Sequence, residues 1–278
     1  MLAQLNINHG VFMQTADPFS QFKANQKVGW GLFAPLEAIT IPAASKLVDF
    51  AEISSHQTVL DCACGTGVVA ITAARKGARV KALDIAPALL EHARANAALA
   101  QTEIEFTEGD VEALPYADAS FDVVVSQFGH MFAPRPEVSI KEMLRVLKPG
   151  GRIAFSTWPK DHFTGLMFNL VGQYVPAPPG VPPSTNWGET TFVRERLAEI
   201  TKDLSFDRSS ILVPSLSPQY NRDVFEKTSA PLIKLVNDFK NDPVKLSSFR
   251  SELEKLITRY TKDNVLHQHY LLSRATKI

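Results

Sequence analysis

The stretch from Val59 to Gly67 constrains this chain more than any other, because it joins a buried strand to a tight loop of small residues and then to a helix. Residues Thr58–Cys62 have the apolar character of a short strand, and a helical pattern follows the loop. Ala63, Gly65 and Gly67 have little or no side chain, so the backbone can turn sharply and approach a ligand closely. The stretch therefore predicts a cofactor-binding loop and leaves the cofactor open.

Strands and helices alternate after this loop. Further strands are predicted at residues 78–85, 104–108, 121–128 and 152–158, with helices at 87–100 and 137–147. Strands joined by helical crossovers form a parallel sheet with helices on both faces. Two later strands are predicted at 205–213 and 267–276, with a mostly helical segment at 224–262 between them. The pattern is that of an α/β protein.

The chain is expected to divide into a helical arm or lid, a cofactor-binding core, and the rest of the sheet with an inserted helical cap. The boundaries are 1–55 for the arm, 56–160 for the core, 161–278 for the remainder, and about 217–264 for the cap. In the arm, a second helix is expected to begin near Pro42. The proline-rich run at 175–183 predicts a rigid loop over the edge of the sheet.

The amino-acid composition limits the kinds of partner that the chain is expected to bind. Lys plus Arg, 29 residues, balance Asp plus Glu, also 29, so the chain lacks the basic surface that nucleic-acid binding needs. Cys62 and Cys64 are too close for an easy disulfide and too few for zinc, and His267 and His269 have no evident third ligand, so no metal site is expected. No apolar run approaches the roughly 18 residues of a membrane span. These features predict a cytoplasmic protein with reduced thiols.

The glycine loop alone does not choose a cofactor. Gly65-x-Gly67-x-x-Ala70 also fits the dinucleotide fingerprint, in which a pyrophosphate rests on a helix N-terminus. Asp84, at the end of the second strand, can accept the hydroxyls of a ribose in either kind of site, or cap the helix that opens at Pro87. A turn without any ligand is a further alternative.

Two downstream segments distinguish between these alternatives. GDVEALPYADASFD occupies Gly109–Asp122, and LKPGG occupies Leu147–Gly151. With the DxxCGTG loop and the acidic end of the second strand, they strongly resemble class I S-adenosylmethionine-dependent methyltransferases over about residues 55–160. Within that family the chain looks most like the small-molecule branch that includes quinone-biosynthesis methyltransferases. The resemblance implies a Rossmann-like, doubly wound, mostly parallel seven-stranded sheet whose last strand is antiparallel.

The resemblance also implies that S-adenosylmethionine is the cofactor, and it assigns residues to its methionine part. Asp61 and the backbone at Ala63, Gly65 and Gly67 would surround the amino acid, and Ser126 would lie near the amino group or the sulfonium. Ala63 departs from the family, which commonly has glycine there. A methyl group is tolerated at this position only if the backbone φ is negative.

The nucleoside part is assigned in the same way. Asp84 would hold the ribose hydroxyls, and Ile85 would pack on the adenine. Asp110 would accept from the adenine amino group, while the Val111 backbone N–H would donate to a ring nitrogen.

Methyl transfer from a sulfonium needs alignment and exclusion of water more than elaborate catalytic groups. His130, just after the fourth strand, is the candidate general base, with packing or capping as its alternative role. The Asn/Asp-Pro-Pro-aromatic motif of N-methyltransferases is absent, since Ser126–Gly129 reads SQFG.

The predicted function is therefore methylation of a small, partly apolar molecule, on oxygen in preference to nitrogen or carbon. An NAD-dependent oxidoreductase and a noncatalytic S-adenosylmethionine-binding protein are the alternatives, and oligomeric state cannot be read.

Overall fold

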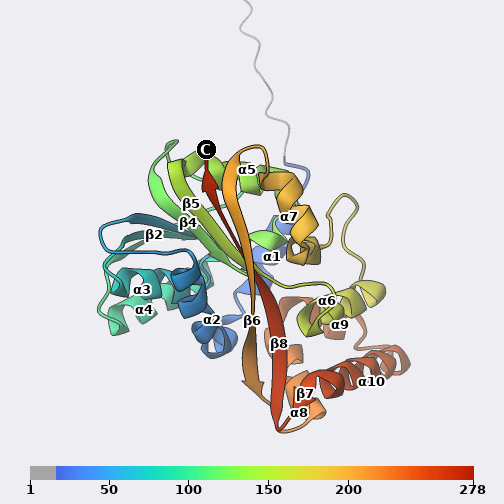
Figure 1. Ribbon diagram of the computed structural model, residues 1–278. Coiled ribbons are helices and arrows are strands. Elements are labelled where there is room, and N and C mark those ends of the chain that lie inside the picture. The colour runs from blue at the N-terminus through green and yellow to red at the C-terminus, as the bar shows by residue number, and fades with distance from the viewer. Residues whose placement is uncertain (1–16) are drawn as a thin grey trace, which may run out of the picture.

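The computed structural model describes residues 17–278, so the predicted arm is described only from residue 17 onward. One mixed sheet has the strand order β3-β2-β1-β4-β5-β8-β6, with the short β7 paired to β8 (Figure 1). The strands are β1 (Thr58–Cys62), β2 (Arg79–Asp84), β3 (Ile104–Glu108), β4 (Phe121–Gln127), β5 (Leu147–Thr157), β6 (Thr201–Pro214), β7 (Thr261–Lys262) and β8 (Val265–Lys277).

The sheet confirms the predicted fold class. Strands β1 to β5 pair in parallel, and β8 runs antiparallel to both β5 and β6. The strand order reverses between β1 and β4. Right-handed crossovers that leave in opposite directions from this point place their helices on opposite faces, which makes the sheet doubly wound.

Helices cover both faces and crowd one edge of the sheet. Those of the first half are α1 (Ser20–Trp30), η1 (Ala34–Leu36), α2 (Glu37–Phe50), α3 (Val68–Arg75), α4 (Pro87–Leu99), η2 (His130–Phe132) and α5 (Pro136–Val146). Those of the second half are α6 (Phe163–Tyr174), η3 (Ser184–Gly188), α7 (Thr190–Leu197), α8 (Pro218–Thr228), α9 (Ala230–Asp238) and α10 (Pro243–Tyr260). Because both faces are covered, the central strands are apolar throughout, as Val59, Leu60 and Val124 illustrate by being fully buried.

Strands β6 and β8 continue well past the other strands. The last residue of β5 in the ladder, Thr157, pairs with Leu271, whereas β8 goes on pairing with β6 as far as the Val265–Pro214 pair. The extra residues make a two-stranded projection of about 20 Å at the carboxyl edge of the parallel strands. In Figure 1 the brown and red strands carry this projection downward, and α8 and α10 are attached to its end.

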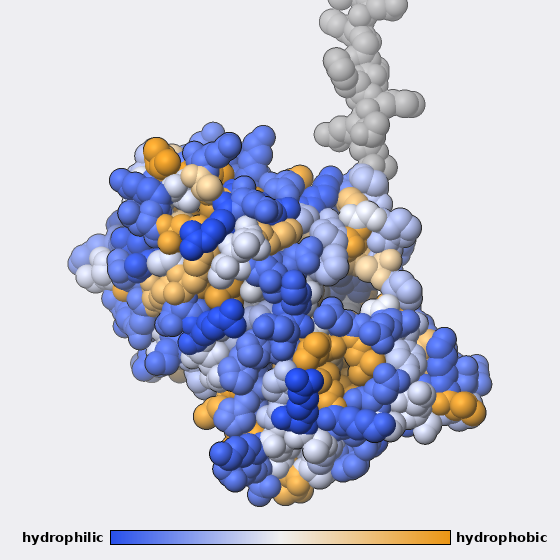
Figure 2. Space-filling model, turned by 45° about the vertical axis from the view of Figure 1, so that its right-hand side comes forward, coloured by the Kyte–Doolittle hydropathy of each residue, from blue (hydrophilic) through white to orange (hydrophobic). Residues whose placement is uncertain are grey.

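The inserted cap consists of α8, α9 and α10, which lie between β6 and β8 in the sequence. Pro231 and Pro243 stand in the first turns of α9 and α10, so each proline begins a new helix within the segment predicted to be mostly helical. The Ser217 side chain caps α8 by accepting from Tyr220 N–H, at 3.1 Å. The cap forms a lower lobe on which hydrophobic surface gathers beside a hollow (Figure 2).

Two local predictions differ from the structure. The helix expected to begin near Pro42 begins at Glu37, because the exposed Pro42 ring faces solvent while Ala43, Ala44 and Leu47 bury the helix against the core. The second difference is α6, for which no helix was predicted and which lies just before the proline-rich run. Its periodicity is weak because nearly all of its residues are apolar or small.

Among residues 17–278, no single helix combines the length and apolar character needed to cross a membrane. Only the bent pair formed by residues 20–30 and 34–50 meets both measures when its members are taken together.

Candidate active site

A pocket of about 200 Å³ lies at the carboxyl edge of the parallel strands. Ligands bind at this edge in doubly wound sheets, at the point where the strand order reverses. The β1–α3 loop, the ends of β2 and β4, the N-terminal helices, α6, α8 and the projection of β6 and β8 all contribute to its wall. The residues predicted to bind the cofactor that lie on this wall are Asp61, Ala63, Gly65, Asp84, Ile85, Asp110 and Val111.

The loop after β1 has an unusual backbone. Ala63, Gly65 and Gly67 have φ angles of 54°, 56° and 83°. The expected negative φ at Ala63 is therefore wrong, because the turn that brings Cys64 N–H to 3.0 Å from Leu83 O passes through the left-handed region. That region costs a non-glycine residue about 1–2 kcal/mol. A Cβ added at Gly65 would meet nothing within 4 Å, so the loop leaves open space beside the pocket.

The end of β4 packs tightly against this loop. A Cβ at Gly129 would lie 2.5 Å from the Ala63 methyl and 2.7 Å from the Ala63 carbonyl oxygen. The preceding Phe128 also has a left-handed φ of 58°, which is strained for a bulky side chain. Its ring stacks on Trp158 with 3.9 Å between centroids. The packing of Gly129 on Ala63 and of Phe128 on Trp158 fixes the position of the β4 end relative to the loop.

Asp84 ties the loop to the neighbouring strand. Its Oδ2 accepts from Gly65 N–H at 2.8 Å, and its Oδ1 accepts from Ala86 N–H at 2.9 Å, beside the start of α4. Burial raises the pKa of Asp84, and the hydrogen bonds from Ala86 and Gly65 oppose that rise. Each oxygen retains a lone pair that can accept from a ligand hydroxyl. Ile85, next in sequence, adds an apolar surface to the same wall.

Asp61 has one carboxylate oxygen without a partner. Its Oδ2 accepts from Ala70 N–H at 3.0 Å, whereas its Oδ1 is buried and has no hydrogen bond among the described residues. Burial, together with the nearby Asp84 carboxylate and against the hydrogen bond from Ala70, raises the pKa of Asp61 to about 8. A buried acceptor without a donor is costly, so this position favours a ligand that brings a cation or an N–H group.

Asp110 is part of a partly buried cluster of charges. Its Oδ1 accepts from Glu112 N–H at 2.8 Å, and its Oδ2 lies 2.7 Å from Lys23 Nζ on α1. The same ammonium lies 2.6 Å from Glu112 and 2.8 Å from Asp17, and Arg135 supplies a second cation to Glu112 and Asp17. Burial alone would lower the pKa of Lys23, but hydrogen bonds to the carboxylates raise it. The cluster therefore fastens α1 over the turn that carries Val111.

Two of the predicted cofactor residues lie outside the pocket wall. Gly67 is the N-cap of α3, and a Cβ there would press on Ala93 and Phe106. Ser126 Oγ donates to Cys62 O at 2.7 Å and accepts from His130 N–H at 3.1 Å. Both positions hold the loop and strand ends in place behind the pocket.

His130 also lies away from the pocket. Its side chain is fully buried, and its ring centroid lies 4.5 Å from that of Phe155 and 4.8 Å from that of Trp187. Neither ring nitrogen has a hydrogen-bond partner among the described residues. Burial lowers the pKa of His130 to about 3, so the ring stays neutral. This placement argues against the predicted role as a general base.

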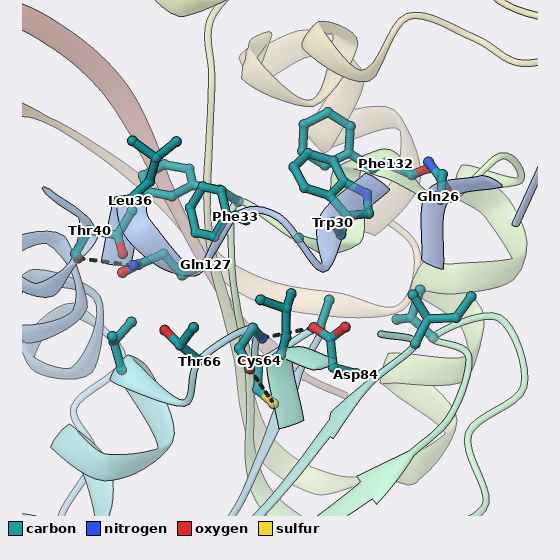
Figure 3. Close-up of a pocket in the computed structure, with 18 of the residues that line it drawn as sticks. Gln26, Trp30, Phe33, Leu36, Thr40, Cys64, Thr66, Asp84, Gln127 and Phe132 are labelled. Atoms are coloured by element: carbon teal, nitrogen blue, oxygen red, sulfur yellow. Dashed lines mark hydrogen bonds between the residues drawn. The ribbon is translucent and has the colours of Figure 1, made fainter. Parts of the chain in front are cut away.

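The N-terminal helices form a roof over the loop. In Figure 3, Trp30, Phe33 and Phe132 lie on the side of the pocket opposite Cys64 and Asp84. The Trp30 and Phe132 rings are in contact, with 4.7 Å between their centroids. These rings place aromatic surface opposite the polar groups of the loop.

The sequence did not reveal most of the opposite end of the pocket. Thr164 and Met167 come from the unpredicted α6, and Gln268 comes from the projecting part of β8. Phe225 is contributed by α8 of the cap. These residues come from segments with no shared motif, and only the fold brings them together.

The two thiols of the loop are reduced and buried. Cys62 and Cys64 form no disulfide, and burial raises the pKa of each thiol well above its ordinary value. Protonated thiols of this kind serve as packing groups, not as nucleophiles.

Sequence comparisons agree with the fold. A family profile described as a methyltransferase domain matches residues 60–155. An uncharacterised protein of Mycobacterium tuberculosis is 33% identical over 243 residues, which cover 87% of this chain and 89% of that protein. A demethylmenaquinone methyltransferase of Deinococcus radiodurans is 38% identical over 145 residues, which cover 51% of this chain and 60% of that protein.

Among solved structures, phosphoethanolamine N-methyltransferase 2 of Haemonchus contortus, in complex with phosphomonomethylethanolamine and S-adenosylhomocysteine, has a TM-score of 0.55 at 17% identity. The match covers 92% of this chain and 59% of that one, and it shows the Rossmann-like methyltransferase fold. The chain belongs to the class I S-adenosylmethionine-dependent methyltransferases, and within them it resembles those of quinone biosynthesis. Its cofactor is S-adenosylmethionine.

Proposed function

We propose that this methyltransferase acts on an oxygen atom of a small, partly apolar molecule, with nitrogen or carbon as the alternative acceptor. The observation that carries the proposal is one continuous pocket, with Asp61, Asp84 and Asp110 at one end and, among the described residues, aromatic side chains without any charged group, such as Trp158, Phe168 and Phe225, at the other. A charged cofactor fits the first end, and a partly apolar acceptor fits the second.

Several features support placing the cofactor at the carboxylate end. The unpartnered Asp61 Oδ1 suits an ammonium group, and the open space beside Gly65 suits a close approach of the ligand to the backbone. Asp84 would accept from the ribose hydroxyls, while Asp110 and the Val111 N–H would recognise the adenine. Bound there, the cofactor supplies an electrophilic methyl group with its own leaving group.

The roles of the other parts of the chain follow from their positions. Trp30 and Phe33 would close over the cofactor and exclude water, since they form the roof above the loop. The aromatic end would orient the acceptor toward the methyl group. The Deinococcus relative is named for demethylmenaquinone, and a substrate of that kind agrees with an acceptor that is partly apolar.

Calorimetry with S-adenosylhomocysteine tests this proposal. We expect purified protein to bind it, and Asp84→Ala to weaken binding by about tenfold or more, because two charge-assisted hydrogen bonds are lost. Asp118→Ala is the matched control, since Asp118 is exposed and outside the pocket wall. Absence of binding, or equal binding by the Asp84 and Asp118 variants, would contradict the proposal.

Turnover separates an enzyme from a noncatalytic binding protein. We expect release of S-adenosylhomocysteine with at least one member of a panel of small phenols, acids and quinone precursors. Binding without turnover of any acceptor would favour the noncatalytic alternative.

A further inference from the structure

The ionisable side chains of the pocket all lie at one end. Along the part of the wall that the structure describes, they are Lys23, Asp61, Cys64, Asp84 and Asp110. Each belongs to the β1–α3 loop, to a strand end beside it, or to α1. This end is the one proposed to hold the cofactor.

The acceptor end has polar groups but no charge. Its aromatic and aliphatic wall is interrupted only by uncharged side chains, which among the described residues are Thr40, Gln127, Thr164, Ser229 and Gln268. Several of them form hydrogen bonds with one another or with the backbone. Gln127 Nε2 donates to Thr40 O at 3.1 Å, and Thr164 Oγ1 lies 3.4 Å from Gln268 Oε1. These groups can orient a substrate, but none can remove a proton at neutral pH.

Nearby histidines do not supply the missing base. His130 is enclosed by Phe155 and Trp187, as described above. His162 and His269 stack on each other with 4.7 Å between centroids, and neither is part of the pocket wall. An acceptor bound at this end therefore meets no titratable side chain of the described chain.

We propose, resting on the function proposed above, that the acceptor is itself an acid: a carboxylic acid, an enol or an acidified phenol on an otherwise uncharged, apolar body. Its hydroxyl loses a proton to water before transfer. The resulting oxyanion uses a lone pair to form a bond to the methyl carbon, and the carbon–sulfur bond breaks with its electron pair returning to sulfur. An aliphatic alcohol, which needs a base, is excluded.

The absence of cationic side chains at the acceptor end, among the described residues, also limits how many negative charges the acceptor can carry. A phosphate or a second carboxylate at this end would be buried without a cation, because no Lys or Arg lines it among the described residues. The reacting oxyanion alone has a nearby positive charge, the sulfonium of the bound cofactor. The acceptor class is therefore a monoacid.

The pH dependence of kcat/KM tests this inference, with the cofactor held at saturation. Two acids of matched shape, whose pKa values differ by about 3 units, should give rising limbs displaced by about the same amount, because the group that ionises belongs to the substrate. Identical limbs for both acids would reveal a protein base and overturn the inference. So would turnover of the matched aliphatic alcohol, or no turnover of any acid by protein that binds S-adenosylhomocysteine. Loss of that binding would instead contradict the proposed function.

A charge introduced at the acceptor end gives a second test. Gln127→Glu and Gln127→Leu both lose the hydrogen bond to Thr40, and only the first adds a negative charge. For the ionised acid, we expect kcat/KM of the Glu variant to be about tenfold or more below that of the Leu variant, since like charges repel in a pocket of low dielectric. Equal values for the two variants would overturn the inference.

Discussion

The two ends of the pocket are built in different ways. The cofactor end consists of backbone groups and carboxylates from segments close in sequence, and most of its polar atoms are hydrogen-bonded to the loop or strand ends. The acceptor end consists of side chains from α2, α6, α8 and the projection of β6 and β8. A fixed loop can therefore serve one cofactor, while the acceptor end can vary with changes in separate helices.

Because the loop and the end of β4 meet at the junction of the two ends, substitutions there should reduce stability the most. Gly129→Ala should destabilise the fold by about 3 kcal/mol, because the new Cβ would clash with the Ala63 methyl and carbonyl oxygen. Denaturant unfolding measures the loss. Gly172→Ala is the matched control, since its Cβ would meet nothing within 4 Å and should stabilise α6 by up to about 1 kcal/mol. Equal effects would show that the junction tolerates movement.

The next largest loss of stability is expected from breaking the ion pairs that hold α1. Lys23→Met should destabilise by about 2 kcal/mol, because it leaves the buried Glu112 and the partly buried Asp110 with one cation fewer. Lys27 lies on the same helix as Lys23 and forms an exposed ion pair with Glu108. Lys27→Met should lower the stability by less than about 0.5 kcal/mol. Thermal and denaturant unfolding of both variants provide the comparison, and similar losses would contradict the special role of the cluster.

The buried carboxyl of Asp61, of which only one oxygen is hydrogen-bonded among the described residues, should make the stability of the protein depend on pH. Because burial raises the pKa of Asp61 to about 8, the folded protein keeps a proton that the unfolded chain releases above its ordinary pKa of 3.8. The associated stability is present below the lower value and is lost as the pH rises toward 8. From about pH 5 to pH 7, wild type should lose about 1 kcal/mol per pH unit relative to Asp61→Asn. Parallel stability curves for the two proteins would show that Asp61 does not titrate in this way.

A substitution in the cap should lower turnover of the acceptor and leave cofactor binding unchanged. Phe225→Leu opens space on α8 and should lower kcat/KM for the acceptor by about tenfold. The affinity for S-adenosylhomocysteine should stay within about twofold, because distant sites act independently. Steady-state kinetics and calorimetry measure the two quantities, and a parallel loss of both would break the distinction between the ends.

The smallest effect is expected in the loop itself. Ala63→Gly should stabilise the protein by about 0.5 kcal/mol, because relief of the left-handed strain exceeds the entropy that glycine loses on folding. Careful unfolding measurements at one pH detect this difference. Destabilisation would show that the Ala63 methyl, packed on Gly129, contributes more than its backbone angle costs.

The sequence predicted the cofactor end far better than the acceptor end. Thr58–Cys62 and Ile104–Glu108 were predicted with the bounds that the structure gives, because short apolar runs between turn signals define buried strands. Asp84 and Asp110 were found through an ordered motif. The left-handed φ of Ala63 was missed, because a turn held by tertiary hydrogen bonds overrides the local preference of alanine.

The acceptor end could not be predicted for a physical reason. Met167 and Gln268 are far apart in sequence and meet only because β8 returns across the sheet beyond α6. His130 was chosen for its position after β4, but neighbouring residues in sequence did not reveal that Phe155 and Trp187 enclose its ring. Contacts of this kind depend on packing between distant segments, which periodicity does not report.

The projection of β6 and β8 brings the two ends of the cap segment together. β6 ends at Pro214 and β8 begins at Val265, just after the short β7, and these two residues are register partners on adjacent strands. The segment between them therefore starts and ends at almost one point in space. Helices of another length can begin and end there without shifting the register of the other strands, but α9 also contacts α1 and α6, so a change in the cap reaches both ends of the pocket.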